Sequence, residues 1–178
     1  MNKTRRIVSD AAFLAISLII SYIEAIFSLS AIIPIPGIKL GFANIITLYL
    51  ISRKRFADAL AVAVLRCTIT FIIFGNPVSF FLSLSGAVLA VFFMSVSLIL
   101  IKRGFSEATI SICGSAGFTV GQTVSAAICF SSGVFYYFPV MFAAAGITGL
   151  VTGIISVLTF KRIDMITGVT IVKNSNHY

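Results

Sequence analysis

The sequence has few charged residues, and acidic residues are the rarest of them. Only 10% of the 178 residues are Asp, Glu, Lys or Arg, and five of these are acidic. A soluble globular domain has roughly 25% charged residues, which cover its water-facing surface. With 59% hydrophobic residues and a mean hydropathy of +1.12, this chain has too few charges for such a surface. The high apolar content also excludes an intrinsically disordered chain.

Histidine and cysteine are also scarce, which excludes several kinds of site. The one histidine, His177, lies in the C-terminal tail, so no histidine-based metal site or Ser-His-Asp arrangement is expected in the core. The three cysteines lie inside apolar runs, as small hydrophobic residues usually do, and do not suggest a disulfide framework. We therefore predict no catalytic residues, no metal and no cofactor.

Long apolar runs are abundant, and short polar, glycine- or proline-containing segments separate them. The runs predict helices, because lipid offers the backbone of an open chain no other hydrogen-bonding partner. The second run has roughly 14 residues, fewer than the ~20 that a perpendicular span needs. We expect one all-α integral membrane domain over residues 1–178, a six-transmembrane-helix bundle with spans at about 10–29, 38–51, 57–74, 78–101, 108–130 and 139–160.

The 13 basic residues against five acidic ones give a formal charge of +8, and their positions explain the excess. If the N-terminus is cytoplasmic, the alternating spans place eleven of the 13 on the cytoplasmic side, and the opposite loops at 30–37, 75–77 and 131–138 contain none. This distribution follows the positive-inside rule. It predicts a multi-pass protein of the cell membrane with both termini in the cytoplasm, and it removes the argument for a nucleic-acid partner.

A cleavable signal peptide is the alternative interpretation of the first run, with Lys3, Arg5 and Arg6 as its basic segment. The run is longer than the ~7–15 apolar residues of a signal peptide, and Ser28-Leu29-Ser30 is a poor cleavage site. Cleavage would also leave five spans and disturb the distribution of basic residues. We therefore expect an uncleaved first helix.

Ionisable residues inside membrane spans are costly and usually functional. Glu24 and Arg66 lie within spans, and Lys39 lies near the outer boundary of the second span. Asn44 and Gln122 share their depth, in the outer half of the membrane. Helical spacing groups polar and small residues on four faces: Ser17, Ser21, Glu24 and Ser28; Ala59, Ala63, Arg66 and Thr70; Ser79, Ser83, Gly86 and Ala90; Ser115, Thr119, Gln122 and Ala126.

These four faces predict a shared interior with a pocket that opens outward. Small and hydroxyl residues are also typical of ordinary helix packing in membranes, which is the alternative for most of them. Glu24 and Arg66 could likewise form a purely structural buried pair.

Ala11 and Ala15 form a pair of small residues near the inner end of the first span. At about 100° per residue, Ala15 lies about 180° around the helix from Glu24. If the Glu24 face lines the interior, the alanine pair faces lipid or another protein.

Several motifs resemble those of a known family. The run Pro36-Gly37-Ile38-Lys39-Leu40-Gly41-Phe42-Ala43-Asn44-Ile45 resembles the hallmark of the Gx transporter family, also called heptaprenyl diphosphate synthase component I. Its later motifs resemble Leu65-Arg66, Phe74-Gly75-Asn76-Pro77-Val78-Ser79-Phe80 and Gly121-Gln122. The family commonly has His-Asn where this chain has Phe118 and Thr119. If that pair contacts ligand in relatives, substrate or affinity differs here.

The family is in turn similar to the substrate-binding S components of energy-coupling factor (ECF) transporters. This resemblance implies a six-helix membrane subunit that captures vitamins or related small molecules in an outward-facing pocket. It also implies a transmembrane coupling partner, driven by two ATPases, onto which an Ala-xxx-Ala motif of the first helix docks. Ala11 and Ala15 match that motif. The chain has no P-loop, so its partners would hydrolyse any ATP.

The sequence thus favours a non-catalytic, substrate-binding subunit of an uptake transporter for a small vitamin-like, anionic or zwitterionic molecule. Lys39 and Arg66 would hold a carboxylate or phosphate, and Glu24 would orient Arg66 or bind an amine. The candidate ligand-binding residues are Glu24, Lys39, Asn44, Arg66, Asn76 and Gln122, of which Asn76 comes from the family motif.

Two alternatives stay open: an accessory membrane subunit of prenyl diphosphate or quinone biosynthesis, and a membrane-complex assembly scaffold that binds no small molecule. Catalysis of diphosphate ionisation by this chain alone is disfavoured, because that chemistry needs clustered carboxylates to hold Mg²⁺. The three aspartates, Asp10, Asp58 and Asp164, are widely spaced in the sequence.

Overall fold

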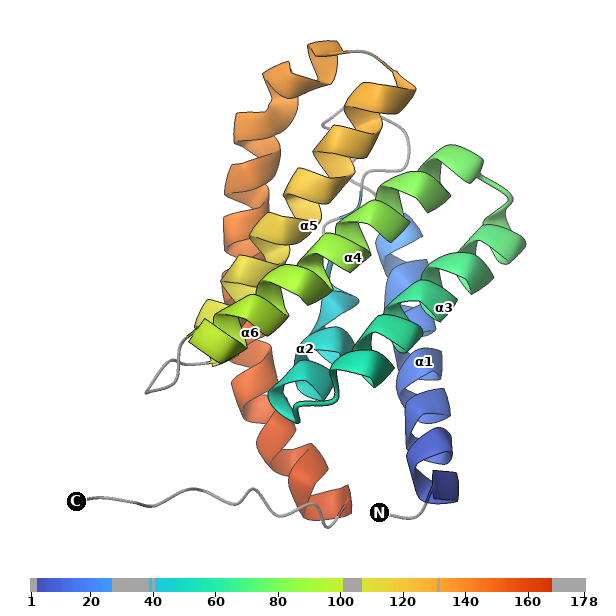
Figure 1. Cartoon of the computed structure of the whole chain (residues 1–178), viewed down its shortest axis with the longest axis vertical. Coiled ribbons are helices and arrows are strands. Elements are labelled where there is room, and N and C mark those ends of the chain that lie inside the picture. Colours follow the sequence, from blue (N-terminus) through green and yellow to red (C-terminus); the bar gives the residue numbers. More distant parts are fainter. Residues whose placement is uncertain (1–2, 27–38, 40, 101–106, 131, 168–178) are drawn as a thin grey trace, which may run out of the picture.

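The computed structural model describes residues 3–26, 39, 41–100, 107–130 and 132–167, and these form a helical bundle (Figure 1). The described residues contain no strand, and the predicted all-α class is confirmed. In chain order the elements are α1 (Lys3–Ile26), α2 (Asn44–Ser52), α3 (Phe56–Phe74), α4 (Pro77–Leu100), α5 (Glu107–Cys129), the 3-10 helix η2 (Ser132–Tyr137) and α6 (Phe138–Thr167).

Five of these helices, all except α2, are long and apolar enough to cross a membrane. Their outward surfaces expose large apolar side chains such as Ile72, Ile128 and Leu158. Contiguous apolar surface of this extent is rare on soluble monomers and is satisfied by lipid. The chain is therefore a multi-pass membrane protein.

The second predicted span differs most from the structure. Within residues 38–51 the described helix begins only at Asn44, and α2 has nine residues, which corresponds to a length of about 14 Å. Residues 38 and 40, and the expected span ends at 27–29 and 101, lie outside the described residues. The exact limits of the spans therefore stay predictions.

The short α2 lies at the centre of the bundle, where it contacts α1, α3, α4, α5 and α6. Seven of its nine residues are buried. In lipid, the non-helical backbone before and after so short a helix would have no hydrogen-bonding partners. Inside the bundle, other protein groups can supply these partners. In Figure 1 it lies between α1 and α6, which stand on opposite sides of the bundle.

The long helices pack mainly on their neighbours in sequence, α3 on α4, α4 on α5 and α5 on α6. α1 is the least enclosed of them, because it contacts only α3 and α2 among the described elements. The beginning of α1, the α2–α3 junction and the end of α6 lie at one end of the bundle, and the α3–α4 turn and η2 lie at the other (Figure 1).

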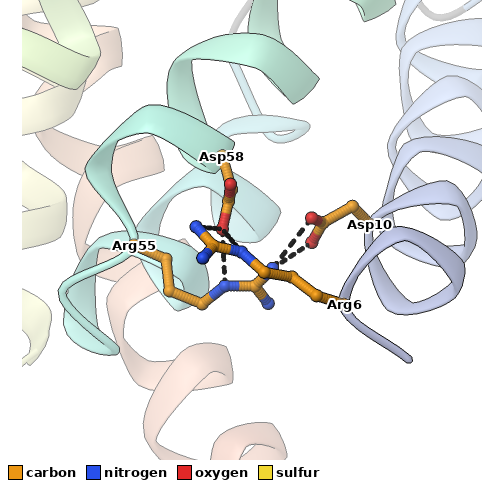
Figure 2. Close-up of polar contacts among 4 residues, drawn as sticks. All are labelled: Arg6, Asp10, Arg55 and Asp58. Atoms are coloured by element: carbon orange, nitrogen blue, oxygen red, sulfur yellow. Dashed lines mark hydrogen bonds and ion pairs between the residues drawn. The ribbon is translucent and has the colours of Figure 1, made fainter. Parts of the chain in front are cut away.

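Two arginines and two aspartates join α1 to the α2–α3 junction at the first of these ends (Figure 2). Arg55 donates from Nη2 to both carboxylate oxygens of Asp10, at 2.6 and 2.8 Å, and from Nε to Asp58 Oδ2 at 2.7 Å. Arg6 Nη2 lies 2.6 Å from the same Asp58 oxygen. The cluster is formally neutral. Basic residues that the sequence assigned only to topology therefore also hold α1 in place.

The close packing of α5 on α4 depends on glycine. A β-carbon at Gly121 would lie 2.6 Å from the carbonyl oxygen of Ser85 and 2.9 Å from the α-carbon of Gly86. Real side chains do not approach backbone this closely. The glycine of the Gly121-Gln122 motif is therefore required by packing.

We expect Gly121→Ala to destabilise the protein by about 1–3 kcal/mol, because α4 and α5 must separate to admit the methyl group. Gly146→Ala is the matched control, since nothing lies within 4 Å of a β-carbon at that helical position. The control should leave the melting temperature unchanged or raise it, because alanine favours helix over glycine. Thermal unfolding of both variants in detergent measures the difference. Equal melting temperatures would contradict this account of the α4–α5 contact.

Candidate functional site

A cavity of about 300 Å³ lies among α1, α3, α4, α5 and the residues that precede α2. Pockets for small molecules start at about this volume. Most residues that line the cavity are charged, hydroxyl-bearing or aromatic. The full lining is Ser21, Glu24, Lys39, Gly41, Arg66, Cys67, Thr70, Phe71, Phe74, Asn76, Ser79, Phe80, Ser83 and Phe118. Of the six residues predicted to bind ligand, Glu24, Lys39, Arg66 and Asn76 line it.

Glu24 bonds to backbone. Its Oε1 accepts hydrogen bonds from the backbone N–H groups of Gly41 and Phe42, the second at 3.1 Å. Gly41 has a φ of +88°, which only glycine adopts readily, and the chain turns there into α2. The carboxylate thus satisfies two donors of a buried, non-helical segment and fixes the approach to α2.

Arg66 reaches the cavity from the middle of α3 and is 5% exposed. Its Nη2 donates to Asn44 Oδ1 at 3.3 Å. Among the described residues no carboxylate lies within ion-pair distance of it, so the pairing of Glu24 with Arg66 considered from the sequence does not occur there. Lys39 lines the same cavity and is near enough to interact electrostatically with both Arg66 and Glu24.

Asn44 and Gln122 do not line the cavity. Asn44 supports Arg66 from the first turn of α2, while its Nδ2 has no hydrogen-bond partner. Gln122 is 1% exposed, and its Nε2 is likewise without a partner. Buried amide groups of this kind are normally satisfied. Because Arg66 and Lys39 line the cavity and Gln122 does not, a direct ligand contact is better supported for the two cations.

Asn76 lies in the turn between α3 and α4, at the rim of the cavity. Gly75 ends α3 in a left-handed conformation with φ of +65°, and Pro77 occupies the first position of α4. Asn76 caps α4, because its Oδ1 accepts a hydrogen bond from the backbone N–H of Ser79 at 3.1 Å. The Gly75-Asn76-Pro77 motif is therefore explained by the turn that it forms between α3 and α4, in addition to any contact with ligand.

Four phenylalanines form the aromatic part of the site, and the sequence indicated only Phe118, as a departure from the family's His-Asn pair. Phe71, Phe74 and Phe80 come from the α3–α4 hairpin, and Phe118 comes from α5. Phe118 packs closely on Gly86, where a β-carbon would lie 2.9 Å from its ring. Phenylalanines are common in any membrane helix, so their presence alone does not indicate a binding site. Only their position near the inward helical face, which Thr70 and Ser83 mark, could have distinguished them from lipid-facing phenylalanines.

The polar faces predicted from the sequence are turned inward, as Ser17, Ser21 and Glu24 on α1 illustrate. Ala11 and Ala15 are exposed on the opposite side of the same helix. Ser28 lies outside the described residues. Among the described residues no three His, Cys, Asp or Glu side chains gather in a way that could hold a metal ion.

Replacing Glu24 with alanine should destabilise the protein by about 1–3 kcal/mol, because one buried and one partly buried N–H group would lose their acceptor. Glu24→Gln keeps a side-chain oxygen at that place and should recover most of the stability. Thermal unfolding of the two variants in detergent compares them. The proposed anchoring role fails if the alanine and glutamine variants are equally unstable.

The chain has been compared with protein families, curated proteins and solved structures. The family model described as heptaprenyl diphosphate synthase component I matches residues 13–159, which include every helix from α2 to α5 and every predicted ligand-binding residue. No curated protein and no solved structure matches significantly. The resemblance noted from the Lys39–Asn44 and Arg66 motifs is thus confirmed at the level of the family: the chain belongs to the heptaprenyl diphosphate synthase component I family.

Proposed function

We propose that this protein is the substrate-binding subunit of an uptake system in the cell membrane and captures a small anionic or zwitterionic molecule. The Arg66 guanidinium carries the proposal. It is almost fully buried, it lines a cavity of ligand size, and its one described hydrogen bond is to an amide. A buried charge without a countercharge is costly, and a bound anion would remove that cost.

The cavity would open to the outside of the cell. Its rim includes Phe74 and Asn76, next to the α3–α4 turn. The basic Arg53-Lys54-Arg55 segment lies at the other end of the bundle (Figure 1). Under the positive-inside rule that basic end faces the cytoplasm, together with both chain termini.

Transport would need partners. The sequence has no P-loop, so ATP would be hydrolysed by separate subunits that act through a transmembrane coupling protein. The resemblance to ECF S components favours α1 as the docking helix. In support, Ala11 and Ala15 lie exposed on a helix that contacts only α2 and α3 among the described elements.

The family description favours a second candidate, an accessory membrane subunit beside a separate prenyl diphosphate synthase. In that case the cavity would bind a prenyl substrate or product for a partner that holds the metal. The nature of the bound molecule and of the co-purified proteins separates the two candidates.

We expect the purified protein to carry a small anionic molecule that mass spectrometry of the denatured sample identifies. Arg66→Gln should reduce its recovery at least about tenfold, since a charge-assisted bond would be lost in a buried site. Lys54→Gln is the control, because it also removes one positive charge but is exposed and outside the cavity. Equal recovery from wild type and Arg66→Gln, or no bound molecule in any sample, argues against the proposal and for a scaffold.

The docking surface gives a separate expectation. The double variant Ala11→Leu/Ala15→Leu should lose its membrane partners in affinity purification, because leucines would hold the two helices apart. It should still bind the ligand, since both residues face away from the cavity. Ala143→Leu, at an exposed position of α6, is the matched control. Undiminished recovery of coupling and ATPase subunits with the double variant would rule out α1 as the docking helix.

A further inference from the structure

The net charge of the cavity limits the kind of anion that fits it. Three ionisable side chains line it: Lys39 and Arg66 have a formal positive charge each, and Glu24 has a formal negative charge. Among the described residues no other charged side chain contributes to the lining. The formal sum at neutral pH is therefore one positive charge.

Glu24 cannot be ignored in this sum. Its carboxylate is fixed by the backbone N–H groups of Gly41 and Phe42, which hold it at the wall of the cavity. It is therefore not free to swing away when an anion enters. A dianion would be attracted about twice as strongly as a monoanion to this net charge, but the cost of removing an ion from water rises with the square of its charge, so burial beside the fixed carboxylate favours the monoanion.

The remaining lining is suited to an apolar body with a few hydrogen-bonding groups. Phe71, Phe74, Phe80 and Phe118 supply aromatic surface. Ser83 is 5% exposed, lines the cavity, and has an Oγ without a hydrogen-bond partner. Such a hydroxyl is expected to be satisfied, and a polar atom of a ligand can satisfy it.

We infer that the cavity selects a small amphiphilic monoanion, with one carboxylate- or sulfonate-like group between Lys39 and Arg66 and an apolar or aromatic body against the four phenylalanines. This inference rests on the proposed function and narrows its substrate class. It disfavours a free diphosphate as the ligand, because a diphosphate would leave an excess of negative charge beside Glu24.

Three naphthalene probes with the same body test this charge rule on the full-length protein in detergent. Naphthalene sulfonate is a permanent monoanion, naphthyl phosphate is mostly a dianion at about pH 7.5, and naphthyl methanol is neutral. The chain has no tryptophan, so the fluorescence of the probes is read against little protein emission. At about pH 7.5 the sulfonate should bind at least about tenfold more tightly than either of the others.

Lowering the pH to about 5 converts naphthyl phosphate to a monoanion while the sulfonate keeps its charge. The ratio of the two dissociation constants, which favours the sulfonate, should then shrink several-fold. Because the charge of the sulfonate does not change, any change in its own affinity reports an effect of pH on the protein. This arm requires no variant, so it does not depend on whether a substitution folds.

Two variants change the charge of the cavity in opposite directions. Glu24→Gln keeps an acceptor for Gly41 and Phe42 and raises the sum to two, so naphthyl phosphate should gain about tenfold relative to the sulfonate. Lys39→Met lowers the sum to zero and should weaken both anions relative to the alcohol.

The inference is overturned if naphthyl phosphate binds wild type as tightly as the sulfonate at about pH 7.5, or if the neutral alcohol does. Loss of that binding in Arg66→Gln would then leave the proposed pocket standing, with a different ligand charge. If Arg66→Gln leaves sulfonate binding unchanged, both the monoanion rule and the pocket of the proposed function fail.

Discussion

The carboxylate of Glu24 fixes the part of the backbone on which the cavity depends. The chain enters α2 through Gly41, Phe42 and Ala43, which are not helical and are surrounded by protein. Non-helical backbone at this depth needs partners for its N–H groups, since lipid offers none. Glu24 supplies them for Gly41 and Phe42 from the neighbouring helix α1. Without that acceptor, neither Lys39 before α2 nor Asn44 at its start would be held beside Arg66.

The same helix is held at its other end by charge. Arg6 and Asp10 of α1 bond to Asp58 and Arg55, which follow α2 (Figure 2). Polar contacts therefore fix α1 to the residues before α2 at one end and to the residues after it at the other. Between them α1 packs on one side only, through contacts such as the Phe13–Tyr49 ring pair. The rest of its surface can contact lipid or a partner. One helix can therefore both hold the site together and present a docking face.

The fold class and the inward faces could be predicted from the sequence because both follow from local composition. Lipid leaves an apolar chain few alternatives to helix, and the 3.6-residue period places Ser17, Ser21 and Glu24 on one face. The partner of Glu24 could not be predicted, because a carboxylate beside two cations suggests an ion pair while the structure gives it to backbone. The helix within the span expected at 38–51 is shorter than predicted. Its apolar residues are buried against protein on every side, so it does not need the length of a lipid-facing span. Phe71, Phe74 and Phe80 were not indicated as lining residues either, because lipid-facing and cavity-facing phenylalanines have the same hydropathy.

The assignment of Glu24 to backbone also changes how the two remaining cations are understood. Had Glu24 paired with Arg66, the cavity would have the same formal charge, but that charge would lie on Lys39 alone. Because Glu24 is fixed at the wall, Arg66 and Lys39 share one uncompensated charge in a site whose lining also includes four phenylalanines. If the cavity selects a monoanion, as we propose, the diphosphate of the family description would bind to a partner and not in this cavity. The charge of the bound molecule therefore distinguishes a subunit that captures its own substrate from one that serves a separate synthase.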